Sequence, residues 1–192
     1  MIFNKLIFKT KNMSYRLCRL CSFIFVGYLL NFSGVSQAET VQFDGVLVED
    51  ACEVYPGDEN IELDFGTVVD KYLYLNTRTH SQPFTIRLIN CDLVLGKEVR
   101  VTFTGNENLA LPGLLALDRG SQASGIAIGL ETENGTPIIL NKVHSYIQNL
   151  HTGNGNDLNL KAYIQGEPNA LLTKKIGRGE FYVTTKFVLE YE

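Results

Sequence analysis

The most informative part of this chain is its last segment, GEFYVTTKFVLEYE, residues 179–192. Along it, one parity of side chains is almost wholly apolar, whereas charged and polar residues dominate the other. The apolar parity consists of Phe181, Val183, Thr185, Phe187, Leu189 and Tyr191. A period of two in aromatic and β-branched residues predicts a β-strand with one buried face.

A strand of this kind needs a neighbour on each side. Unpaired N–H and C=O groups on an exposed edge recruit other chains, so most proteins blunt an edge strand with proline, a bulge or charge. No proline, bulge signal or polar tail follows this strand. We therefore expect either a central strand or an open edge that a partner fills.

The first 38 residues have the features of a signal peptide. Five basic residues precede a mostly apolar run over 20–30, and Ser36 and Ala38 supply small side chains at the positions that determine cleavage. The apolar run is too short to span a membrane as a helix. We expect 1–38 to be removed on export, with Met13 as an alternative start to Met1.

Removal of this segment makes the chain acidic. It takes away five of the 17 basic residues and none of the 21 acidic residues, which leaves a net charge of −9. Such a charge argues against nucleic acid and against an anionic membrane surface as partners.

Two cysteines remain after cleavage, Cys52 and Cys91. A pair of cysteines in an exported chain most often forms one disulfide. Closing a loop of this length stabilises a domain by about 3–4 kcal/mol on the chain-entropy model. A metal site is disfavoured, because neither thiol has a second ligand at CxxC or CxxH spacing.

Strand signals dominate the 154 residues that follow residue 38. The expected strands lie at 41–48, 61–65, 84–90, 99–103, 126–130, 137–140, 158–164 and 181–192. Asn134 and Gly135 predict a hairpin turn, and one short helical turn is possible at 109–117. Short strands with regular turn signals predict a single all-β domain of the sandwich type.

Catalytic chemistry is poorly represented. His80, His144 and His151 lie in polar, turn-like surroundings without metal-ligand spacing. The stretch 153–157 lacks the alternating acids of a calcium loop. The formal glycosylation sequon at Asn134 is better explained by the hairpin. We expect no catalytic residue, no metal, no cofactor and no enzyme activity.

Several elements, taken in order, resemble the subunits of chaperone–usher fimbriae, the type 1 pilin family. Gly45 stands seven residues before Cys52, and the stretch LDFGTV follows at 63–68. The stretch LINCD surrounds Cys91 at 88–92. Gly179 is the fourteenth residue from the C-terminus and Tyr191 is penultimate. The resemblance covers essentially all of 41–192.

This resemblance implies an incomplete immunoglobulin-like β-sandwich that lacks its last strand, with residues 51–192 as the pilin domain and 39–50 as an N-terminal arm. A periplasmic chaperone lends a strand to the open groove, and at the outer-membrane usher the arm of the next fimbrial subunit replaces it. The implied donor residues are Val41, Phe43, Gly45 and Leu47. The implied chaperone and groove residues are Gly179, Phe181, Val183, Phe187, Leu189, Tyr191 and Glu192.

The function predicted in this way is that of a structural subunit, exported through the periplasm to an adhesive fimbrium on the cell surface. Rod and adaptor subunits share these features, so both roles stay open. The alternative is a secreted carbohydrate-binding β-sandwich, which needs a surface platform of aromatic side chains. Tyr55, Tyr72 and Tyr74 could form a small patch, but most aromatic residues alternate into the core.

Overall fold

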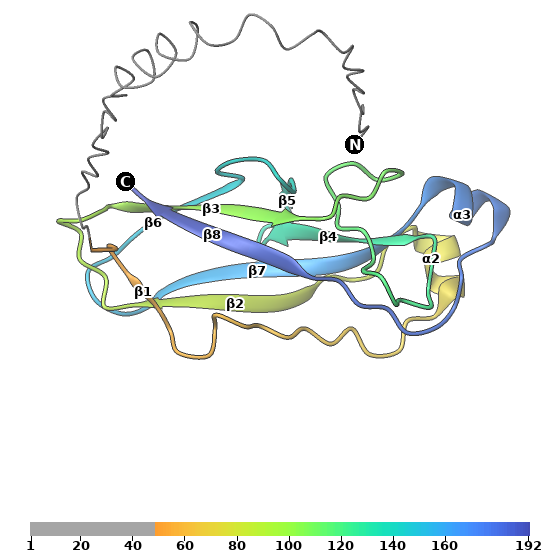
Figure 1. Ribbon diagram of the computed structural model, residues 1–192, viewed down its shortest axis with the longest axis horizontal. Helices are drawn as coiled ribbons and strands as arrows, with labels where there is room; N and C mark the ends of the chain where they lie inside the picture. Colours follow the sequence, from red (N-terminus) through yellow and green to blue (C-terminus); the bar gives the residue numbers. More distant parts are fainter. Residues whose placement is uncertain (1–48) are drawn as a thin grey trace, which may run out of the picture. The chain divides into compact units, whose positions relative to one another are not determined.

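A computed structural model of the protein describes residues 49–192 (Figure 1). The predicted signal peptide, the predicted strand at 41–48 and the four predicted donor residues Val41, Phe43, Gly45 and Leu47 lie outside the described residues.

The described residues form two antiparallel sheets and two short helices. The five-stranded sheet has the order β1-β2-β7-β4-β5, and the three-stranded sheet has the order β6-β3-β8. The elements are β1 (Glu53–Val54), α2 (Asp70–Asn76), β2 (Gln82–Ile89), β3 (Glu98–Gly105), β4 (Ile126–Thr132), β5 (Pro137–Ile138), β6 (Tyr146–Asn149), β7 (Asn156–Gly166), α3 (Pro168–Thr173) and β8 (Thr185–Tyr191). The predicted all-β sandwich is confirmed.

The core lies between the two sheets and follows from the alternation within the central strands. In β7, Leu158, Leu160 and Ile164 turn inward and are almost completely buried. In β3, Val99 and Val101 do the same from the opposite sheet. Each such side chain contributes about 1.5–3 kcal/mol by leaving water, so these rows are the main stabilising feature of the sandwich.

Most predicted strands are confirmed within a few residues. The strands expected at 84–90, 99–103, 126–130 and 158–164 are β2, β3, β4 and β7. The expected strands at 137–140 and 181–192 are shorter, as β5 and β8. The hairpin turn is also confirmed: β4 and β5 pair in antiparallel register, and Gly135 has φ +81°, which glycine adopts without strain. The short strands β1 and β6 were not predicted.

The predicted strand at 61–65 is wrong. The segment keeps the expected alternation, because Ile61, Leu63 and Phe65 are half-buried against the core while Glu62 and Asp64 are exposed. It has no ladder partner among the described strands. Figure 1 shows it running from β1 to α2 along one side of the domain without pairing. The alternation correctly predicted which side chains of this segment face the core, but it could not show that no strand pairs with the segment.

The predicted helical turn at 109–117 is also wrong. The carboxamide oxygen of Asn108 accepts hydrogen bonds from the backbone N–H groups of Ala110 and Leu111, which folds the chain into a loop instead. Leu109 is 98% exposed at its tip. The two real helices were missed, although α3 has a readable signal in Pro168, which occupies its first turn.

Candidate functional site

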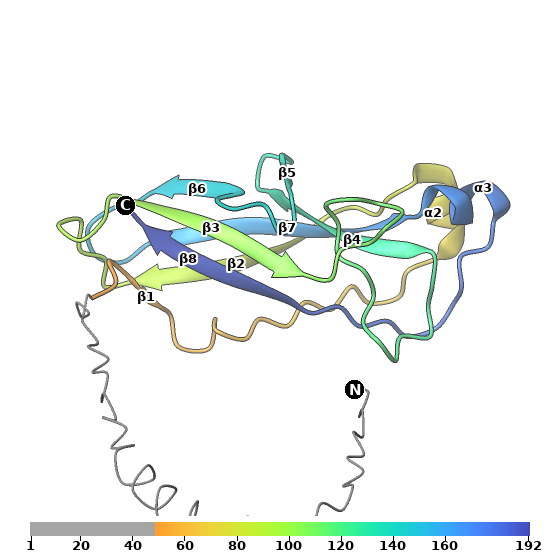
Figure 2. The same ribbon diagram turned by 45° about the horizontal axis from the view of Figure 1, so that its top comes forward.

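β8 lies at the edge of the three-stranded sheet. It pairs with β3 from Gly105 opposite Thr185 to Val99 opposite Tyr191. Among the described strands, none pairs with its other side. Figure 2 shows β8 beside β3, with the unpaired segment between β1 and α2 on the far side of β8. The strand is therefore an edge and not a central strand.

Two rows of half-buried apolar side chains face each other across this open side. Both rows pack against the core, yet neither is fully covered. One row, from the unpaired segment and β1, holds Val54, Ile61, Leu63, Phe65 and Val68; the other, from β8 and the residues before it, holds Phe181, Val183, Phe187, Leu189 and Tyr191. The rings of Phe65 and Phe181 bring the rows together, with centroids 6.3 Å apart.

At the other end the rows separate around a hollow of about 570 Å³. Phe187, Leu189 and Tyr191 line it from β8. Residues of 49–59 and 90–95 line the opposite side, and five of them are acidic: Glu49, Asp50, Glu53, Glu59 and Asp92. We call this space the β8 hollow. It combines an apolar floor with an acidic rim.

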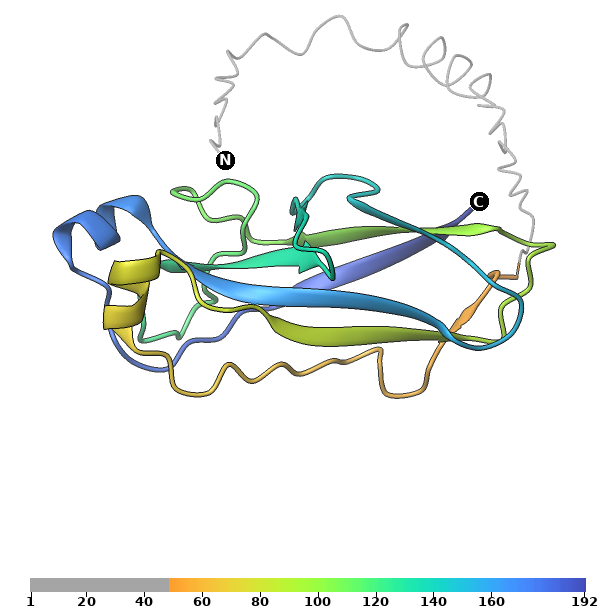
Figure 3. The same cartoon turned by 180° about the vertical axis from the view of Figure 1, so that it is seen from behind.

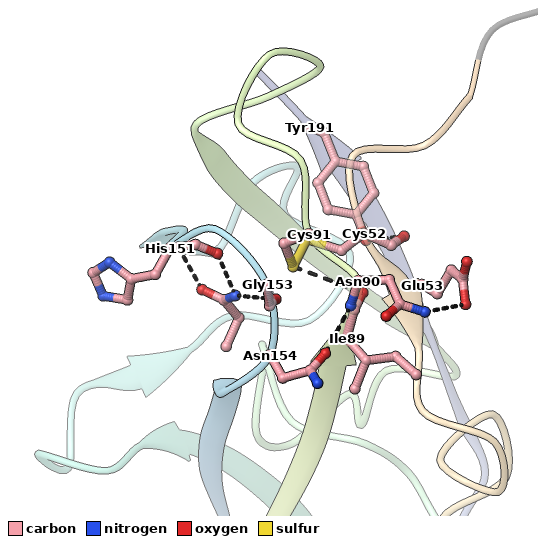
Figure 4. Close-up of a disulfide and its surroundings, with 10 residues drawn as sticks. Cys52, Glu53, Ile89, Asn90, Cys91, His151, Gly153, Asn154 and Tyr191 are labelled. Carbon is pink, nitrogen blue, oxygen red and sulfur yellow. Dashed lines mark hydrogen bonds between the residues drawn. A yellow bond between two sulfur atoms is a disulfide. The ribbon is translucent and has the colours of Figure 1, made fainter.

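The predicted disulfide between Cys52 and Cys91 is present beside the β8 hollow (Figure 4). It joins the residue before β1 to the end of β2. The loop 153–157, which resembled a calcium loop in composition, supports it instead: Gly153 and Cys91 exchange backbone hydrogen bonds of 2.9 and 3.1 Å. The side chain of Asn156 bonds the backbone of His151 and holds this loop closed.

Tyr191 ties β8 to the disulfide. Its hydroxyl donates a hydrogen bond of 3.3 Å to the carbonyl oxygen of Cys52. Burial, with a smaller contribution from the negative charge of Asp50, raises the pKa of Tyr191 to about 12, so the hydroxyl stays a neutral donor. Gly96 makes room for this contact, since a Cβ there would lie 3.0 Å from the Cβ of Tyr191. Sequence reasoning missed Gly96, which carries no motif.

The last residue, Glu192, is held by this domain. Its backbone oxygen accepts from the N–H groups of Lys97 and Glu98, and its side chain pairs with Arg100. The hydrogen bond that Arg100 donates to the carboxylate of Glu98, together with the negative charges of Glu192 and Glu98, raises the pKa of Arg100 above its usual value. The end of β8 is thus fixed on the β3 side through Glu192, and to the disulfide through the hydroxyl of Tyr191.

A family model described as "Fimbrial protein" matches residues 41–192. The chain belongs to the fimbrial protein family. Among its relatives, the fimbrial adapter PapK from Escherichia coli is 34% identical over 173 residues, which cover 86% of this chain and 97% of PapK. The major MR/P fimbria protein from Proteus mirabilis is 32% identical over 158 residues, which cover 80% and 83% of the two chains.

Solved structures agree on the fold. The P pilus rod subunit PapA superposes with a TM-score of 0.64 at 20% identity, covering 74% of this chain and all of PapA. The fold is therefore the immunoglobulin-like sandwich of pilins. This fimbrial protein is a structural subunit that assembles with other pilus subunits at the cell surface, and it is not an enzyme.

The remaining predicted groove residue of this fimbrial subunit, Gly179, lies before β8 and does not line the β8 hollow. It has φ +136°, and a Cβ on it would lie 2.4 Å from the Cβ of Gln122. Backbone bonds from Gln122 and Ala123 to Glu180 fix the chain next to it. Glycine is needed here so that the chain can enter β8 close against the segment 118–124.

The possible tyrosine patch does not form. Tyr55 lies near the disulfide, where the guanidinium of Arg87 stacks on its ring at 4.0 Å. Tyr72 and Tyr74 belong to α2; the hydroxyl of Tyr72 is bonded to His80, and that of Tyr74 accepts from the backbone of Ile176. These contacts separate the three rings, so the structure offers no support for a carbohydrate platform of these tyrosines.

Residues 49–192 contain no cluster of histidine, cysteine and acidic side chains suited to a metal ion. None of the helices described there has the length and apolar character needed to cross a membrane. A second hollow of about 420 Å³ lies beside α2. Its polar side chains satisfy one another, since Arg78 pairs with the buried carboxylate of Glu131 at 3.0 Å and lies over the ring of Tyr163.

Proposed function

We propose that this fimbrial subunit polymerises by donor-strand exchange, with the open side of β8 as the acceptor. The observation that carries the proposal is the difference in burial within one sheet. The inward side chains of β3 are covered completely, whereas those of β8 are only half-covered and have no strand beside them. A strand laid along β8 would complete both the hydrogen-bond ladder and the core.

The donor in this proposal is the arm 39–50 of a neighbouring subunit. Its residues Val41, Phe43 and Leu47 alternate in the way needed to place side chains between the two half-buried rows, and Gly45 allows a close backbone approach. Each buried apolar side chain contributes about 1.5–3 kcal/mol, and each net backbone hydrogen bond about 1 kcal/mol. Together they suffice for a junction that rarely opens.

The donor is expected to run antiparallel to β8. Every ladder between described strands is antiparallel, including that of β8 with β3. A parallel donor would bring together the parts of the two subunits that carry the Cys52–Cys91 disulfide, so that each arm could enter the other's groove and close a dimer. An antiparallel donor places successive subunits head to tail, which produces an open fibre.

Before assembly, a periplasmic chaperone would occupy the same side of β8 with its own strand, near Gly179, Phe181 and Val183 at one end and Glu192 at the other. The outer-membrane usher would then be the place where the next arm replaces it. In this proposal residues 1–38 direct export into the periplasm, and the finished fibre contributes to adhesion of the cell.

The test is an arm substitution with a matched control. Phe43→Asp places an unpaired carboxylate in an apolar groove, which is costly, so this variant should still bind the chaperone and accept an arm but should not donate one. Gln42→Asp adds the same charge on the opposite parity and should assemble like the parent. Fibres of normal length from Phe43→Asp would show that the arm is not the donor.

A further inference from the structure

The two ends of the domain carry different surfaces. At one end, α2 and α3 lie side by side (Figure 3), and we call residues 69–76 and 167–180 the helix end. Leu75 and Leu172 are 83% and 84% exposed there, and Val69 is also exposed. These three exposed aliphatic side chains, two on the short helices and Val69 just before α2, do not stabilise the isolated domain, because they face water.

The opposite end contains the disulfide, and we call residues 49–59, 89–98 and 189–192 the disulfide end. Val94 is 90% exposed there, and Leu95 is exposed beside it. The five acidic residues that line the β8 hollow lie at this end. Of the other charged residues at this end, Asp58 pairs with Arg87, Glu98 and Glu192 pair with Arg100, Glu190 pairs with His144, and Lys97 is exposed. The five rim carboxylates outweigh this single lysine and dominate the surface charge.

The helix end carries more basic than acidic side chains. Its basic side chains are Lys71, Lys174, Lys175 and Arg178, and its acidic ones are Asp70, Glu167 and Glu180. Arg178 pairs with Asp70, and Glu167 accepts a hydrogen bond from Asn108. Lys174 and Lys175, next to each other at the end of α3, are exposed. They form the most concentrated positive charge of this end.

The short connection between arm and domain decides which surfaces meet. The last proposed donor residue, Leu47, stands four residues before Ala51, which is buried in the domain. Four residues span at most about 14 Å when fully extended. With an antiparallel arm, Leu47 lies toward the start of β8, where the rings of Phe65 and Phe181 meet. This is also where α2 begins, at Asp70, five residues after Phe65. The donor domain must therefore sit against the helix end.

We propose that the disulfide end of one subunit docks on the helix end of a second copy of this chain, the copy that receives its arm. This second contact rests on the proposed donor-strand exchange and adds to it. The exposed leucines of α2 and α3 face Val94 and Leu95, and the lysine pair of α3 faces the acidic rim. The contact guides the arm into the groove and sets the angle between successive subunits.

Charge selects this pairing over the alternatives. Two disulfide ends would bring acidic rims together, and two helix ends would bring lysine pairs together, both of which cost free energy through like-charge repulsion. Only the head-to-tail contact joins opposite charges. Because that contact uses two different surfaces of each copy, it continues into a fibre and does not close on itself.

The experiment compares polymerisation of chaperone-bound subunits, followed as loss of monomer at low ionic strength. Lys174→Glu/Lys175→Glu should slow polymerisation about tenfold, because charge pairs across an interface act mainly on the association rate, and the difference should shrink as salt screens it. The matched control, Lys142→Glu/Lys161→Glu, reverses two charges on residues that belong to neither end and should match the parent. Adding Glu49→Lys/Asp50→Lys to the first variant should restore the rate.

Three outcomes would overturn the docking contact while leaving donor-strand exchange in place. Lys174→Glu/Lys175→Glu could polymerise at the parent's rate, or it could polymerise slowly and not be rescued by Glu49→Lys/Asp50→Lys. The third outcome is a parent chain that joins only to a different fimbrial subunit and not to a second copy of itself. The arm variant Phe43→Asp, run alongside, separates the two proposals. If Phe43→Asp also polymerises at the parent's rate, donor-strand exchange itself fails, and the docking contact fails with it.

Discussion

β3 and β8 share a sheet, a register and the same alternation of side chains, yet they bury those side chains differently. Val99, Val101 and Phe103 of β3 are at most 1% exposed, whereas the inward residues of β8 are half-buried. β3 has a strand on each side, and β8 has one on one side only. Alternation therefore reports which face of a strand meets the core, and the neighbouring strands decide how completely that face is covered.

The largest expected effect is on the free energy of unfolding, and it distinguishes the covered strand β3 from the open strand β8. Phe103→Ala removes a ring from the completed part of the core and should lower the free energy of unfolding by about 3–5 kcal/mol. Phe187→Ala, on the open side, should cost clearly less in the isolated domain and more once a donor strand is bound. Denaturant unfolding with and without a peptide of residues 40–50 measures both. Equal losses for the two variants without the peptide would remove the distinction between the strands.

The disulfide should come next, because it fastens the segment that forms the far wall of the β8 hollow. Cys52→Ala/Cys91→Ala should lower the free energy of unfolding by about 2–4 kcal/mol and reduce the amount recovered from the periplasm. Mass spectrometry of the parent should show no free thiol. Two free thiols in periplasmic protein would contradict the assignment.

A smaller effect is expected where the chain enters β8. Gly179→Ala places a Cβ against Gln122 at a positive φ and should destabilise the domain by about 1–3 kcal/mol. Gly120→Ala is the control, because Gly120 also has a positive φ, +100°, but a Cβ there meets no atom within 4 Å. The difference in thermal unfolding midpoint isolates the packing contribution. No difference would mean that contact with Gln122 is unimportant.

The smallest expected effect is a loss of stability at alkaline pH, caused by the ionisation of Tyr191 at the end of β8. The pKa of Tyr191 is raised from its ordinary value near 10 to about 12 in the folded domain, so the folded state holds this proton more tightly than the unfolded state. Stability that is present below pH 10 should therefore be lost as the pH rises from 10 to 12. Tyr191→Phe should make this loss shallower in denaturant unfolding, and an unchanged pH profile would contradict the burial.

The sequence predicted strands well where alternation and pairing coincide, as in β2, β3 and β7. It could not predict pairing itself: the segment 61–65 and β8 show the same alternation, but the first has no ladder partner and the second has one. It also could not predict that the carboxamide oxygen of Asn108 would bind the backbone N–H groups of Ala110 and Leu111, which folds this segment into a loop and not a helix.

The site was predicted unevenly for the same reason. The apolar row of β8 and the disulfide follow from parity and cysteine count. Gly96 does not, because its role depends on the position of Tyr191 in space. The contrast between acidic and basic ends also appears only when residues distant in sequence, such as Asp50 and Asp92, are brought to one end by the fold.

The open side of β8 is tested most directly by supplying a donor strand within one chain. A copy of residues 40–50 is fused after Glu192 through a short flexible linker, and its stability and oligomeric state are compared with those of the unfused chain at equal concentration. The same fusion carrying Phe43→Asp in the added copy is the matched control. We expect a soluble, stable monomer for the first fusion, and self-association or low stability for the other two proteins. If the unfused chain is an equally stable monomer, the sandwich was already complete and β8 does not accept a donor strand.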